Sequence, residues 1–250
     1  MFKKQNKKSL PGIKPLCQES LDFFKKNFHS LFSLSLIATG IIFAFSFILG
    51  ILGASIGFAL SLEKQTPIFI AILCLFILLG LILAIAAYFF IVLARAVIIL
   101  AILRQDQGKE IKIKKIWQDG FSQAKSVISL EILASLLVFA GYLLLFIPGA
   151  VFTIWFSFSI FVLLNENKKG RLALRRSKAL VKGYFWPVAF RVFALSFLFA
   201  LASLALSLIP FFGSIASMAL GLFFLPLFSI YTYLIYKKLL IIKTKKSKLK

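Results

Sequence analysis

Three ionisable side chains stand within or beside the apolar stretches of this chain, where charge is costly: Arg95, Glu131 and Arg191. A charged group in apolar surroundings is a candidate functional residue by default. Its desolvation costs free energy, so such a group is retained only where it is paired or has a function. We expect these long side chains to extend to polar surroundings. The alternatives are that Glu131 pairs with Arg95 or with Arg191 and so locks helices together, or that the three form a proton or substrate site.

The other residues that carry chemistry are few and isolated. The single histidine, His29, has no second histidine beside it, and neither Cys17 nor Cys74 has a partner at metal-ligand spacing. Acid–base or nucleophilic catalysis needs convergent groups, and ATP binding needs a glycine-rich loop of a kind that the chain lacks. The sequence therefore predicts no catalytic, cofactor-binding or metal site, and a protein that is not an enzyme.

The composition indicates which elements carry these residues. The chain has 250 residues, of which 61% are hydrophobic, and a mean hydropathy of +0.98. A soluble domain of this size cannot hide so much apolar surface, whereas long uncharged runs are typical of transmembrane helices. Four such runs occur, and the last two are each long enough for two spans: 30–62, 65–94, 132–165 and 192–236.

We therefore predict an all-α integral membrane protein with about six transmembrane helices in three hairpins. A span needs roughly 20 residues, and proline or glycine marks the turns, as at Pro148-Gly149. The predicted spans are 31–55, 68–92, 127–147, 149–165, 188–209 and 212–236.

The distribution of basic residues predicts the orientation. Lys and Arg number seven in 1–28, six in 104–125, eight in 168–191 and seven in 237–250, whereas the intervening turns contain only Lys64. Basic residues are retained on the cytoplasmic side. We expect both termini in the cytoplasm of a multi-pass protein of the bacterial cytoplasmic (inner) membrane. The net charge of +22 then reflects topology and not nucleic-acid binding.

The cytoplasmic segments share a pattern that resembles an internal repeat. Aligned on Ser20, Gly120 and Ser177, each has a lysine five residues later and apolar residues at helical spacing. The pattern divides a single membrane domain into units at about 14–104, 112–166 and 171–242, between basic tails at 1–13 and 243–250.

Each unit is expected to begin with an amphipathic helix in the lipid headgroup layer. Such a helix either only anchors its hairpin or also binds anionic lipid of the cytoplasmic leaflet, or a protein partner. Attraction to anionic lipid is about 1 kcal/mol for each basic residue. The candidate headgroup contacts are Lys25, Lys125, Arg171, Arg175, Lys178 and Lys182.

Small residues recur at every fourth position in the first and last spans. Such rows let helices approach closely in lipid. We expect them to pack helices within the bundle, the alternative being self-association or a partner helix. The residues are Gly53 and Gly57 in the first span, and Gly213, Ser217 and Gly221 in the last.

The segment Ile147-Pro148-Gly149-Ala150 and the segment ALRRSKALVKGYFW at 173–186 carry a resemblance to a known group. They resemble bacterial multipass membrane proteins classed with the membrane domain of glycerophosphoryl diester phosphodiesterase, and residues 19–28 are similar to the start of that domain. In that enzyme, hydrolysis belongs to a separate soluble barrel, which nothing here resembles. The resemblance implies a membrane domain without catalytic residues.

These patterns lead to two hypotheses of function. The first is a non-enzymatic scaffold, regulatory or accessory membrane component that acts through its basic cytoplasmic surface, with no nucleic acid and no cofactor. The alternative is a transporter or permease for a small apolar or lipid-like substrate, because repeats and a proline-kinked span at Pro226 are common in transporters. A cavity near the middle of the bilayer would favour the second.

Overall fold

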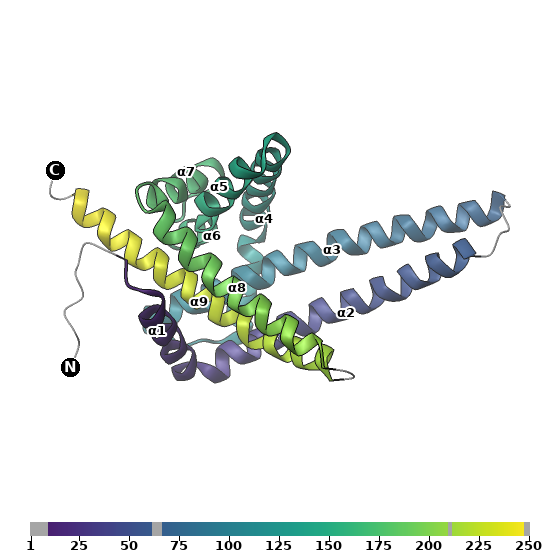
Figure 1. Cartoon of the computed structure of the whole chain (residues 1–250), viewed down its shortest axis with the longest axis horizontal. Coiled ribbons are helices and arrows are strands. Elements are labelled where there is room, and N and C mark those ends of the chain that lie inside the picture. The colour runs from purple at the N-terminus through teal and green to yellow at the C-terminus, as the bar shows by residue number, and fades with distance from the viewer. Residues whose placement is uncertain (1–9, 62–66, 210–211, 248–250) are drawn as a thin grey trace.

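The computed structural model describes residues 10–61, 67–209 and 212–247, and within them every regular element is an α-helix (Figure 1). Pro210 and the turn residue Lys64 lie outside the described residues. The helices are α1 (Ile13–Lys26), α2 (Phe28–Ser61), α3 (Pro67–Asp106), α4 (Ile113–Leu144), α5 (Phe146–Phe156), α6 (Ser159–Glu166), α7 (Gly170–Val181), α8 (Phe185–Ser207) and α9 (Gly213–Ser247).

Six helical segments are long and apolar enough to cross a membrane, which confirms the predicted all-α class and the number of apolar spans. They overlap all six predicted spans. Their bounds are Phe28–Phe58, Phe69–Asp106, Ile113–Leu144, Phe146–Glu166, Phe185–Ser207 and Ala219–Lys245.

The helix boundaries differ from the prediction at the charged ends. The second predicted amphipathic helix and the third span form one helix, α4, and α3 continues to Asp106. Neither stretch contains a proline, so the chain has no reason to leave the helix where its hydropathy falls. In contrast, the fourth predicted span is interrupted between Phe156 and Ser159, where α5 ends and α6 begins.

The hydrophobic core lies at the charged end of the molecule. Residues 92–103 of α3 are all buried except Arg95, and residues 229–236 of α9 are buried beside them. Around them pack α1, α4, α6 and α7. We name this part, made of α1, α6, α7 and residues 28–38, 92–134 and 229–245, the charged bundle.

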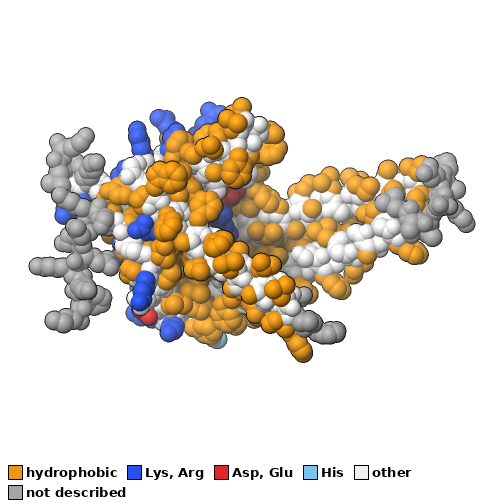
Figure 2. All heavy atoms as spheres, viewed as in Figure 1, with side chains coloured by type: hydrophobic (Ala, Val, Ile, Leu, Met, Phe, Trp, Pro, Cys, Tyr) orange, Lys and Arg blue, Asp and Glu red, His pale blue; other side chains and the backbone are white. Residues whose placement is uncertain are grey.

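Three antiparallel hairpins leave the charged bundle. Figure 1 shows the α2/α3 pair as a long arm, the α4/α5 pair and the α8/α9 pair pointing elsewhere, and α1 on the side away from the tip of the arm. The α2/α3 arm exposes apolar side chains such as Phe47 and Leu75. In Figure 2 these arms are covered by hydrophobic atoms, while Lys and Arg gather over the charged bundle.

The amphipathic helices turn their apolar faces into the protein, which corrects the expectation that those faces enter lipid. In α1 the buried residues include Leu16 and Phe24, and in α7 they include Leu174 and Leu180. The physical reason is that α3 and α9 are longer than the bilayer needs: 40 residues of α3 extend about 60 Å, against a hydrocarbon core of about 30 Å. The apolar side chains on the excess length of α3 and α9 must be shielded from water, and the apolar faces of α1 and α7 pack against them.

The three aligned small residues of the repeat are contact points in this core. Ser20 is buried and donates to the carbonyl oxygen of Leu16 at 2.7 Å, and Ser177 donates to the carbonyl oxygen of Trp155 at 2.6 Å. A Cβ on Gly120 would lie 2.5 Å from Cγ2 of Val97. Each position therefore needs a small side chain.

Candidate lipid-binding surface

The carboxylates of the charged bundle are used to join its own helices. Five of them form ion pairs, each with a lysine or arginine. The pairs are Glu19–Lys238 at 3.4 Å, Asp106–Lys237 at 2.5 Å, Asp119–Arg104, Glu131–Arg95 at 3.6 Å, and Glu166 with Arg176 at 2.9 Å and Lys168 at 3.0 Å.

Glu166 is the most connected of these carboxylates. At the end of α6 it accepts from Nε of Arg176 on α7 and from the hydroxyl of Tyr236 on α9, the latter at 3.2 Å. The amide of Asn165 donates to the same hydroxyl at 3.2 Å. A single acidic group therefore joins three helices to one another.

Asp106 does the same at the end of α3. It accepts from the hydroxyl of Tyr233 at 2.8 Å and from Nζ of Lys237 at 2.5 and 2.7 Å. Sequence analysis did not single out Asp106. The available signal was an acidic residue three positions after the apolar stretch 96–103, together with the Tyr-x-x-Tyr-Lys stretch at 233–237.

Of the two candidate partners of Glu131, the structure brings Arg95 close and not Arg191. Nη1 of Arg95 lies 3.6 Å from Oε1 of Glu131. The guanidinium of Arg191 instead donates to backbone oxygens: to Pro11 at 2.8 Å, to Leu10 at 3.1 Å and to Pro187 at 2.6 Å. Arg191 thereby ties the segment before α1 to α8.

The basic residues of α7 form a stripe on its outer side. The side chains of Arg171, Arg175, Lys178 and Lys182 are exposed and lie opposite the buried face. Nζ of Lys178 lies 3.9 Å from the centre of the Trp155 ring, a cation–π contact. Within the described residues, none of the four has a carboxylate within 4.0 Å. We name these four residues the α7 stripe.

Trp186 and Lys25 are further exposed side chains on other helices. Trp186 lies in the first turn of α8, after the break in the chain at Gly183, and is 78% exposed, as an aromatic side chain at a membrane interface would be. Lys25 is exposed in the last turn of α1.

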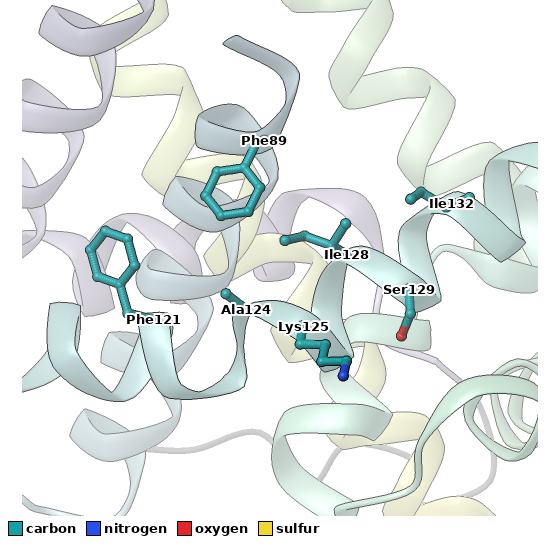
Figure 3. Close-up of a pocket in the computed structure, with 7 residues that line it drawn as sticks. All are labelled: Phe89, Phe121, Ala124, Lys125, Ile128, Ser129 and Ile132. Carbon is teal, nitrogen blue, oxygen red and sulfur yellow. The ribbon is translucent and has the colours of Figure 1, made fainter. Parts of the chain in front are cut away.

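Lys125 lies at a shallow groove of about 590 Å³ between α3 and α4 (Figure 3). Phe89, Ile128 and Ile132 lie on one side of α4, while the Lys125 and Ser129 side chains point away from Phe89. The groove therefore combines an apolar wall with a cationic edge, the pattern that suits an anionic amphiphile. Its lining is Phe89, Phe121, Ala124, Lys125, Ile128, Ser129 and Ile132.

The small residues expected to pack helices fall into two groups. At Gly213 a Cβ would lie 2.4 Å from the carbonyl oxygen of Leu206, and Ser217 donates to the carbonyl oxygen of Ser203 at 3.3 Å, so both join α9 to α8. At Gly53, Gly57 and Gly221 a Cβ would meet nothing within 4 Å. These three leave open helix surface within this chain.

A closer glycine contact joins α4 to α5, and sequence analysis missed it. A Cβ on Gly141 would lie 3.0 Å from the backbone nitrogen of Gly149, and a Cβ on Gly149 would lie 2.3 Å from Cγ of Tyr142. The signal was present in the two glycines, which lie eight residues apart around the tip of the hairpin.

Comparison with known proteins gives no relative: no family model matches the chain, and no curated protein or solved structure matches it. Within the described residues, no three His, Cys, Asp or Glu side chains gather in a way that could hold a metal ion. The groups that do converge are basic and face outward.

Proposed function

We propose that this polytopic membrane protein is a non-enzymatic scaffold or accessory component of a bacterial cytoplasmic membrane. Its charged bundle lies on the cytoplasmic side and binds the headgroups of anionic lipids through the α7 stripe, with Lys25 and Lys125 as further contacts. The observation that carries the proposal is the basic stripe, which faces outward without a carboxylate partner among the described residues. The resemblance to a phosphodiesterase membrane domain without its catalytic barrel supports the same role.

The charge balance favours an external anion. The sequence has 30 Lys and Arg residues against 8 Asp and Glu residues, and five of those carboxylates already join helices of the bundle. The remaining positive charge requires counterions from outside the protein. At about 1 kcal/mol for each basic residue, the four residues of the stripe contribute about 4 kcal/mol, roughly a thousandfold in partitioning.

The test compares binding of phosphatidylglycerol and phosphatidylcholine to the full-length protein in detergent, with bound lipids counted by native mass spectrometry. The variant is Arg171→Gln/Arg175→Gln/Lys182→Gln. We expect the wild type to retain phosphatidylglycerol and the variant to bind it roughly a hundredfold more weakly, as three lost contacts imply.

The matched control, Lys109→Gln/Lys112→Gln/Lys114→Gln, removes the same charge from exposed positions outside the stripe. It should bind phosphatidylglycerol within about threefold of the wild type, since short-range headgroup contacts and not net charge carry the affinity. Equal losses in the two variants, or a wild type indifferent to lipid charge, would contradict the proposal.

A transporter for a lipid-like substrate is the second candidate, and the groove beside Lys125 is the observation in its favour. The measurement is flux of fluorescent lipid across proteoliposomes containing the protein. Flux that is lost in Ile128→Trp, which fills the groove, would favour transport over the scaffold role. Absence of flux for lipid and small apolar candidates would contradict the transporter hypothesis.

A further inference from the structure

The α4/α5 hairpin has much of its length inside the charged bundle. Ser177 of α7 donates to the carbonyl oxygen of Trp155, and Lys178 of the stripe lies over the Trp155 ring. The end of α5 is therefore at the level of the basic residues. Of the most apolar window in Phe146–Glu166, 44% is buried in the protein, against none of that in Phe69–Asp106, and most of this burial lies in residues 158–163, which follow α5.

What projects beyond that level is too short to cross a bilayer. The 11 residues of α5 extend about 16 Å, and residues 132–144 of α4, beyond the Arg95–Glu131 pair, extend about 20 Å. The hydrocarbon core is about 30 Å thick. The α2/α3 arm has the required length, because residues 67–91 of α3 alone extend about 37 Å.

The tip of the α4/α5 hairpin also has the wrong composition for water. Five consecutive large apolar residues, 143–147, are each between 68% and 76% exposed, and none carries a polar side chain. The turn that joins α2 to α3 contains Glu63 and Lys64 in its sequence, as expected of a loop that reaches water. The two tips are thus suited to different solvents.

The backbone of the hairpin is suited to hydrocarbon. Leu145 is the single residue between α4 and α5, and its N–H still donates to the carbonyl oxygen of Gly141 at 3.1 Å. The hydroxyls of Tyr142 and Thr153 lie 3.5 Å apart across the hairpin, and Thr153 also donates to the carbonyl oxygen of Gly149 at 2.9 Å. Lipid tolerates a turn only when polar groups find such partners within the protein.

We propose that the α4/α5 hairpin is re-entrant: it enters the membrane from the side of the charged bundle and turns back among the acyl chains of one leaflet. Residues 143–147 then lie in hydrocarbon, while Trp155 and the α7 stripe lie at the headgroups of the same leaflet. In Figure 1 the hairpin leaves the bundle in another direction from the α2/α3 arm.

The experiment places single cysteines in the full chain after Cys17→Ser and Cys74→Ala. Leu145→Cys probes the α4/α5 tip, and Lys64→Cys, in the turn between α2 and α3, is the control. In sealed vesicles of each orientation, we expect a membrane-impermeant maleimide to label position 64 from the side opposite the carboxyl terminus. Position 145 should remain unlabelled from either side, and become labelled only in detergent.

A fluorophore attached at position 145 then measures depth. Lipids with a quencher in the middle of the acyl chain should quench it more strongly than lipids with a quencher at the headgroup. Ile147→Cys repeats both measurements if the first variant does not fold. Maleimide labelling of position 145 from either side of sealed vesicles, or strongest quenching from the headgroup, would overturn the proposal. Neither readout depends on anionic-lipid binding, so the two proposals fail separately.

Discussion

Helix α3 contains two segments of similar composition in opposite surroundings. Residues 69–91 belong to the α2/α3 arm and expose side chains such as Leu75, Leu81 and Ile85, each near 60%. Residues 92–103 are just as rich in Ile, Leu, Val and Ala, yet every one except Arg95 is buried. One apolar sequence is thus exposed over part of its length and covered by protein over the rest.

The difference teaches that hydropathy indicates that a segment needs apolar surroundings. It does not indicate whether lipid or the protein itself forms those surroundings. The exposed apolar side chains of the arm suit acyl chains, and helix association in lipid gains nothing from the hydrophobic effect. In the charged bundle, α4, α6 and α9 cover residues 92–103. The apolar faces of α1 and α7 are buried in the same packing. Substitutions should therefore have unequal effects in the two segments.

The largest expected difference is between Ile99→Ala in the bundle and Ile82→Ala in the arm. Ile99 is 1% exposed, so its truncation leaves a cavity and should lower the free energy of unfolding by about 3 kcal/mol. Ile82 is 55% exposed, and lipid or detergent fills the space, so the loss should be below about 1 kcal/mol. Titration with SDS in mixed micelles measures both, and equal losses would break the comparison.

A smaller difference is expected between two glycines. In Gly120→Leu the new side chain meets Val97, since a Cβ would already lie 2.5 Å from its Cγ2, and we expect a loss of about 2 kcal/mol in the same titration. Gly57 in the arm has open space, so Gly57→Leu should be neutral or stabilising by up to about 1 kcal/mol through helix propensity. A destabilised Gly57→Leu would instead reveal a second copy or a partner helix on that face.

The sequence predicted the helical class and the six apolar segments, because uncharged runs long enough to cross a bilayer are rare in soluble domains. It could not predict that residues 92–103 are buried in the charged bundle, since their hydropathy matches that of the arm. Periodicity predicted an apolar face for α1 and for α7 but could not say whether protein or lipid covers it. The same limit left the partner of Glu131 open, because Arg95 and Arg191 both lie near the charged ends of their apolar runs.

Arg95 lies at the border of the two segments, and its pair with Glu131 gives the smallest expected effect. The side chain of Arg95 is 46% exposed and that of Glu131 is 17% exposed, at a distance of 3.6 Å. A pair this accessible to water is worth less than about 1 kcal/mol. Glu131→Gln should therefore lower the free energy of unfolding by at most that amount, and 1 M salt should abolish the difference.

The size of that loss reports where the bilayer ends. If Arg95 lay within the hydrocarbon, removing its partner would leave an unpaired guanidinium there, at a cost of roughly 3 kcal/mol that salt does not screen. The double variant Arg95→Gln/Glu131→Gln separates the two cases, because it removes the unpaired charge and would recover most of a large loss but little of a small one. A loss below about 1 kcal/mol places the border at Arg95, so that residues 92–103 lie outside the membrane and the bundle is their only cover.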